Sequence, residues 1–150
     1  MAFKLVSGAG AVLDSASLRV DKDGNAISAN AVVAFNRASN VVTAASSTTD
    51  SQSANCYLGV NASDSAVAAG TAQAIIVPFV KGQIWEADCN ANTASSQLYA
   101  RCRLTNSTTL DNQADRTTSS DVFEIVGIIG SATNKKVRVR FIGNIGQVAA

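Results

Sequence analysis

Apolar and polar residues alternate along several short segments of the chain, which predicts β-strands with one buried face and one face in water. The alternation is clearest in Gln83–Asp88, Leu98–Leu104 and Lys136–Ile142. Ala74–Val80 and Val122–Ile129 are apolar on both faces, so we expect them at the centre of a sheet. No segment carries the 3.6-residue stripe of a long helix. The pattern therefore predicts an all-β fold of short antiparallel strands.

The chain as a whole fits one domain. We expect a β-barrel or β-sandwich over residues 14–150, preceded by an N-terminal arm, residues 1–13. One helical turn is expected at Asp64–Gly70. The polar stretch Thr105–Ser120 is interpreted as a long loop, with a contact role and disorder as alternatives. Further strands are expected at Phe3–Val6, Leu18–Val20, Ala31–Phe35, Val41–Ala45 and Cys56–Val60.

Composition narrows the classes of function. The chain has 150 residues, of which 47% are hydrophobic and only 15% charged, with a net charge of +1. A domain of this length buries enough surface to fold without disulfides or metals. The near-neutral charge supplies no global basic field for nonspecific binding of nucleic acid. No run approaches the roughly 18 apolar residues of a membrane-spanning helix, and a signal peptide is not expected.

The residue inventory argues against an enzyme. The chain has no histidine, so a Ser–His or Cys–His nucleophile cannot be built, and we expect neither a cofactor nor a catalytic residue. Glu86 and Asp88, a close pair of carboxylates on one strand face, are interpreted as a solvated face that meets Arg101 or Arg103 across a hairpin. The three cysteines lack CxxC spacing, so we expect no metal site and three free, buried thiols: Cys56, Cys89 and Cys102.

The most suggestive cluster is cationic. Arg101 and Arg103 face outward on one expected strand, and Lys136, Arg138 and Arg140 face outward on another. If these strands are neighbours, five positive side chains share one face. That face is either a binding surface for an anionic partner or a solvated surface neutralised by nearby carboxylates. An acidic protein surface suits it better than nucleic acid, because only Tyr99 is placed to stack on a base.

The second half of the chain resembles the small β-rich decoration (cement) proteins of tailed-phage capsids. The likeness rests on Val77–Asp88, with the spacing to Ser96–Cys102, and on Val122–Gly127 leading to Lys135–Phe141. It implies a β-barrel or β-sandwich that forms a homotrimer and binds the major capsid protein on the exterior of the virion. In such proteins an N-terminal arm often contacts the capsid.

The resemblance and the cationic cluster together give a candidate protein interface. The alternatives are another virion subunit of the tail or a fibre, and a single-stranded nucleic-acid-binding β-barrel. The candidate residues lie in the N-terminal arm and on the two cationic strands: Phe3, Lys4, Leu5, Arg101, Arg103, Arg138 and Arg140.

Overall fold

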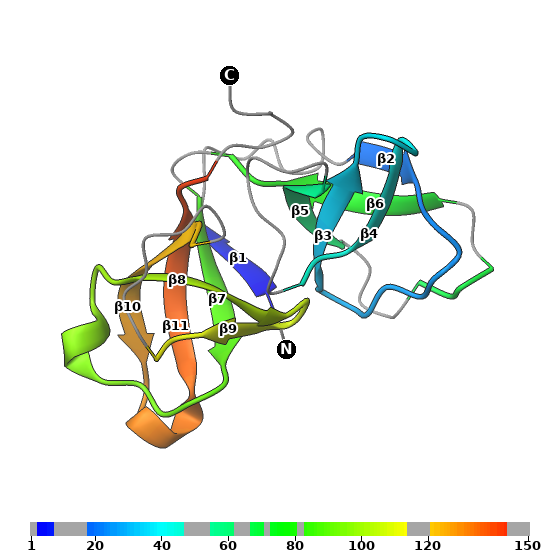
Figure 1. Ribbon diagram of the computed structural model, residues 1–150. Coiled ribbons are helices and arrows are strands. Elements are labelled where there is room, and N and C mark those ends of the chain that lie inside the picture. The colour runs from blue at the N-terminus through cyan, green and yellow to red at the C-terminus, as the bar shows by residue number, and fades with distance from the viewer. Residues whose placement is uncertain are drawn as a thin grey trace.

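The computed structural model of the chain is built almost entirely from β-strands, which form two sheets, A and B, side by side (Figure 1). The expected all-β fold is confirmed. The only helical elements in the described part of the chain are two single turns of 3₁₀-helix, η1 (Ser95–Gln97) and η2 (Ala132–Asn134). The structure describes residues 3–7, 18–46, 55–61, 67–70, 73–80, 83–113 and 121–143.

Sheet A closes into a ring. Its strand order is β1-β7-β11-β10-β8-β9, and β9 pairs back onto β7 in parallel through Asp88↔Thr109 and Cys89↔Leu110. All other pairings in sheet A are antiparallel. The strands are β1 (Phe3–Ser7), β7 (Ile84–Cys89), β8 (Arg101–Asn106), β9 (Thr109–Asp111), β10 (Phe123–Ile129) and β11 (Lys136–Phe141).

Sheet B is inserted in the chain between β1 and β7, which pair with each other from Phe3↔Ala87 onward. Its strand order is β2-β6-β5-β3-β4. A bridge between Lys22 and Val42 joins the end of β2 to β4, so sheet B also curls toward closure. The strands are β2 (Leu18–Asp21), β3 (Val32–Asn36), β4 (Val41–Ala44), β5 (Asn55–Asn61) and β6 (Gln73–Pro78).

The main core fills the interior of sheet A and extends to the face of sheet B that packs against it. Inward residues of β7 and β11 are buried, and their outward neighbours are half-buried or exposed, as strict alternation predicts. Aromatic rings join the two sheets. Phe79, which follows β6, stacks on Phe141 of β11 with 4.6 Å between ring centroids, and Tyr57 of β5 meets Phe123 of β10 edge to face.

A second, smaller core lies on the other side of sheet B and contains Ile27, Val42 and Ile76. Strand β3 contributes to both cores. Val32 and Ala34 belong to the main core and Val33 to the second, and all three are almost completely buried. Sheet B is therefore a shared layer between two hydrophobic interiors.

A β-bulge in β5 lets this strand serve both cores. Val33 pairs with Gly59 and Ala34 with Tyr57, so Leu58 is an extra residue without a partner on β3. The bulge turns both Tyr57 and Val60 toward the main core, while Leu58 packs against the second. Gly59 pairs with Pro78 of β6, and the backbone of β6 fills the space that a side chain would need.

Three sequence predictions are wrong in detail. The strand expected over Leu98–Leu104 does not begin at Leu98. Leu98–Ala100 form a turn, and β8 begins at Arg101. The expected loop Thr105–Ser120 contains the end of β8 and all of β9, and its residues 114–120 lie outside the described part of the chain. In place of a helical turn, Val67 forms an antiparallel bridge with Ile27, and residues 64–66 are not described.

Ala74–Val80 also differs from its prediction of two buried faces. Ala74 and Ile76 of β6 are buried, but Ile75 between them is 46% exposed. The second face of β6 is therefore only partly buried, since Val77 on that face packs against the main core while Ile75 is exposed. In sheet B, β3 has buried residues on both sides.

Candidate protein-binding surfaces

The predicted cationic cluster lies on the outer face of sheet A, but its two strands are not neighbours. β10 lies between β11 and β8 in the strand order. Arg101 of β8 and Arg138 and Arg140 of β11 are exposed, and Arg103 is half-buried. The five-cation face expected from the sequence is therefore divided by the outward residues of β10.

Glu124 of β10 occupies that dividing position. It is the register partner of Arg140 on one side and of Arg101 on the other. Its carboxylate accepts hydrogen bonds from the Arg140 guanidinium, with Oε1 2.6 Å from Nη2 and 2.8 Å from Nε. A carboxylate thus lies between two arginines across three adjacent strands.

The other carboxylates of this face continue the alternation of charge. Glu86 of β7 lies in register between Lys4 of β1 and Arg138 of β11. Asp88 forms an ion pair with Lys136, with 2.6 Å between Oδ1 and Nζ. The prediction that these carboxylates meet arginines of β8 across a hairpin is wrong, because β7 and β8 are not paired and β11 supplies the opposing cations.

The outer face of sheet A is therefore a mosaic of both signs of charge. In the two ion pairs the Asp88 side chain is 32% exposed and the Glu124 side chain only 16% exposed. Fully exposed pairs contribute about 0–1 kcal/mol each to folding, and the Arg140–Glu124 pair lies at or above the upper end of that range. Such a surface is chemically suited to pair with groups of either sign on another protein, and positive groups outnumber negative ones among the described residues. We define the charged face by these residues: Lys4, Glu86, Asp88, Arg101, Glu124, Lys136, Arg138 and Arg140.

The predicted N-terminal arm is partly a strand of sheet A. Phe3 is 1% exposed and packs against the Phe123 ring, so its side chain is not accessible to another protein. Lys4 is exposed, and Leu5 is the register partner of Trp85. Of the arm residues proposed for the interface, Lys4 belongs to the charged face and Phe3 belongs to the core. Residues 1–2 and 8–13 lie outside the described part of the chain.

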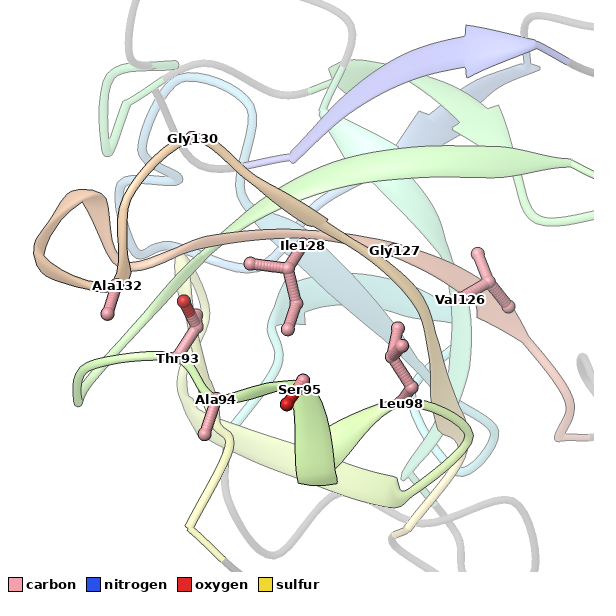
Figure 2. A pocket seen from close by; sticks show the side chains of 9 residues that line it. All are labelled: Thr93, Ala94, Ser95, Leu98, Val126, Gly127, Ile128, Gly130 and Ala132. Carbon is pink, nitrogen blue, oxygen red and sulfur yellow. The ribbon is translucent and has the colours of Figure 1, made fainter.

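A second surface feature, an apolar groove, was not predicted from the sequence. It has a volume of about 600 Å³ and lies between the end of β10 and the segment that precedes β8 (Figure 2). Figure 2 shows the side chains of Ile128 and Leu98 projecting into the space between these two segments. We define the groove by its lining residues, none of which is charged: Thr93, Ala94, Ser95, Leu98, Val126, Gly127, Ile128, Gly130 and Ala132.

The groove exists because the two segments separate after a short pairing. β10 pairs with β11 along its length but with β8 only at Phe123 and Glu124. The N–H of Tyr99 still donates to the Ile125 carbonyl at 2.7 Å, and the next backbone contact between the two segments is from the Thr93 N–H to the Ala132 carbonyl. The only sequence signal for this gap is that β10 is apolar on both faces.

Thr93 carries an unusual polar group in this wall. The residue is 5% exposed, and its hydroxyl oxygen is buried with no hydrogen-bond partner in the structure. A buried polar group left without a partner costs about 1–3 kcal/mol. Because the hydroxyl oxygen itself is shielded from solvent, a molecule in the groove could satisfy it only after the Thr93 side chain rotates.

Tyr99 projects from the rim of the groove. The residue is 72% exposed, and its backbone adopts a φ of 66°. A left-handed conformation at a bulky residue costs about 1–3 kcal/mol and persists where neighbouring structure enforces it. Here the Tyr99 N–H bonds to Ile125 and the Ala100 N–H bonds to Gln97, which fix the turn on both sides.

The three cysteines are buried thiols, as expected. Cys89 at the end of β7 is the most perturbed of them. Burial raises the pKa of its thiol from an ordinary value of 9.0 to about 12, and the negative charge of Asp88 adds to the shift. Because the folded-state pKa is the higher one, this thiol stabilises the fold below about pH 9, and the contribution is lost as the pH rises from 9 towards 12.

Native thiol labelling tests this placement. We expect none of the three cysteines to react with iodoacetamide at pH 8 in the folded protein, because burial keeps them inaccessible and holds Cys89 in the unreactive thiol form. After unfolding in denaturant without reductant, mass spectrometry should find all three alkylated. Rapid labelling of Cys89 in the folded state, or an unlabelled pair after unfolding, would contradict this expectation.

Within the described ranges, no group of three or more His, Cys, Asp or Glu side chains is placed to hold a metal ion. In the same part of the chain, no helix is long and apolar enough to cross a membrane. A scan against models of known protein families and a search of curated protein sequences both found no match.

Proposed function

We propose that the protein is a structural component of a tailed-phage virion, which binds the outer surface of an assembled capsid and holds neighbouring capsid subunits together. The observation that supports this most is the charged face of sheet A. Exposed Arg101, Arg138 and Arg140 stand on a closed ring of strands, with carboxylates between them. Two further parts of the proposal come from the resemblance to decoration proteins. These are the partner, which is the major capsid protein, and the homotrimeric state.

A repeating shell explains how such a surface can bind firmly. Each exposed charge pair contributes little by itself, about 0–1 kcal/mol. A shell presents the same acidic sites many times, and an oligomer that engages several of them gains affinity through effective concentration without new contacts. The closed ring of paired strands keeps the backbone positions of these charges fixed, which reduces the entropy lost on binding.

The double variant Arg138→Ala/Arg140→Ala tests this function. We expect Arg138→Ala alone to change the free energy of unfolding by no more than about 1 kcal/mol, because its side chain is exposed. Arg140→Ala should add a loss of about 1–3 kcal/mol, because the Glu124 carboxylate, whose side chain is 16% exposed, loses its ion pair. We expect the affinity for cognate assembled capsids to fall about tenfold or more, through loss of charge complementarity. Co-sedimentation with preformed capsids at two salt concentrations measures this change.

Arg19→Ala is the matched control, because Arg19 is an exposed arginine on β2 of sheet B. It should bind capsids as the parent does. Equal binding by the double variant and the parent would show that the charged face makes no contact. Binding of single-stranded oligonucleotides that falls steeply with salt would instead support the nucleic-acid-binding alternative.

Deleting residues 1–13 is a poor test of an arm contact, because it also removes β1 and with it the buried Phe3 ring. Lys4→Ala is the better variant. It removes the exposed cation beside Glu86 and leaves the paired backbone of β1 in place.

A further inference from the structure

We propose that two copies of this chain associate by inserting Tyr99 of one copy into the apolar groove of the other. This inference deepens the proposed function, because it names a contact by which the copies would assemble. It is tested without any capsid, so the two proposals fail separately.

The backbone that carries the inserting side chain is fixed in place. Tyr99 lies in a turn whose backbone is fixed by hydrogen bonds to Ile125 and, through Ala100, to Gln97. The residue is 72% exposed, the highest exposure among the large hydrophobic residues in the described part of the chain. Tyrosine loses little conformational entropy on binding and is enriched among the residues that dominate protein interfaces.

The groove offers the complementary surface. Leu98 and Ile128 project into the space and supply apolar contacts for an aromatic ring, and no charged residue lines it. Thr93, itself 95% buried, carries in the wall a hydroxyl that has no hydrogen-bond partner. Such a site suits a side chain that is apolar along its length and carries one uncharged polar group at its end. A tyrosine side chain has this form.

The positions of the two features favour a second copy as the source of the tyrosine. Leu98 lines the groove and Tyr99 is the next residue, yet the Tyr99 ring is exposed and therefore does not fill its own groove. The inserting ring and the receiving groove are adjacent on one surface, and neither carries a charge that would repel an identical copy. A surface that holds both halves of a contact can bind itself, either reciprocally across a twofold axis or head-to-tail in a closed ring.

Sedimentation equilibrium over a wide range of protein concentration tests the contact. The parent should form species above the 15.4 kDa of one chain. Tyr99→Ala should raise the dissociation constant by about thirty-fold or more, the effect of removing an interface residue that dominates binding. Ile75→Ala is the matched control, because it removes another exposed apolar side chain from a different sheet and should leave association unchanged.

Variants of the groove test the receiving side. Ser95→Trp places a large ring in the groove from an exposed lining position and should weaken association as Tyr99→Ala does. Tyr99→Phe and Thr93→Val each remove one hydroxyl with little change of shape. If these hydroxyls meet, the two changes should weaken association by similar factors, and the double variant should be no weaker than either one alone.

Two results would overturn the proposal. One is a parent protein that stays monomeric at every concentration. The other is association that survives both Tyr99→Ala and Ser95→Trp. Association that depends on Tyr99 in a protein that binds no capsid would support this contact while refuting the proposed function. Capsid binding by a strict monomer would do the reverse.

Discussion

Replacing Phe79 with alanine is expected to lower the free energy of unfolding by about 3–5 kcal/mol, the range for removing a fully buried aromatic ring. Phe79 is 1% exposed and stacks on Phe141, with further ring contacts to Trp85 and Phe123. Its backbone N–H bonds to the Leu58 carbonyl of sheet B at 3.0 Å. The residue therefore belongs to sheet B by its backbone and to the core of sheet A by its ring.

Chemical denaturation of the parent and the variant measures this effect. Phe79→Leu is the control, because it keeps most of the buried volume and should cost clearly less than Phe79→Ala. A loss below about 1 kcal/mol for the alanine variant would be incompatible with a ring packed between three others. It would mean that the two sheets do not share the core described above.

Gly59→Ala is the second change for which we expect a large loss of stability. A Cβ at position 59 would overlap the Val77 carbonyl and lie 2.7 Å from the Pro78 Cα. These atoms belong to the backbone of β6, so no side-chain rotation can relieve the clash, and β5 and β6 must move apart. We expect a loss of about 3 kcal/mol, at the upper end for overpacking.

Gly127→Ala is the matched control, since it places the same methyl group on another strand. Its Cβ would lie 3.6 Å from the nearest atom of Arg138, an ordinary contact. Thermal unfolding of the two variants should therefore separate them by several degrees. A Gly59→Ala protein as stable as Gly127→Ala would show that β6 does not approach β5 as closely as the structure has it.

The strands that were well predicted are those with one face in a core and one in water. β7 and β11 alternate because Trp85, Ala87, Val137 and Val139 point into the ring of sheet A. The same alternation led to a wrong prediction at Leu98, where the apolar–polar pattern continues through a turn and not along a strand. Alternation records which side chains are apolar, but it does not record the positive φ of Tyr99 that ends the extended backbone.

Features that depend on distant pairings could not be predicted. β9 has a single buried apolar residue, Leu110, and is a strand because β7 and β8 pair with it. The order of β8, β10 and β11 decides whether the cations are contiguous, and period-2 patterns carry no information on order. The outward direction of Arg138 and Arg140 was predicted correctly, because it depends only on local alternation.

The apolar groove was missed for the same reason. It is formed where the segment before β8 separates from β10, and neither segment is unusual on its own. From the sequence, Val126 and Ile128 were interpreted as apolar residues of a central strand. The structure shows that one edge of that strand faces the groove in place of a neighbouring strand.

The double burial of β3 has a consequence for how the protein can be divided. Val32 and Ala34 complete one hydrophobic interior and Val33 completes the other, so a fragment that lacks β3 leaves both interiors open. The two sheets look like separate lobes in Figure 1, yet they are not interchangeable modules. A chimaera that exchanges one lobe for a foreign barrel would expose the face that β3 now covers. The smallest unit that can be inherited or transplanted intact is the pair of sheets together.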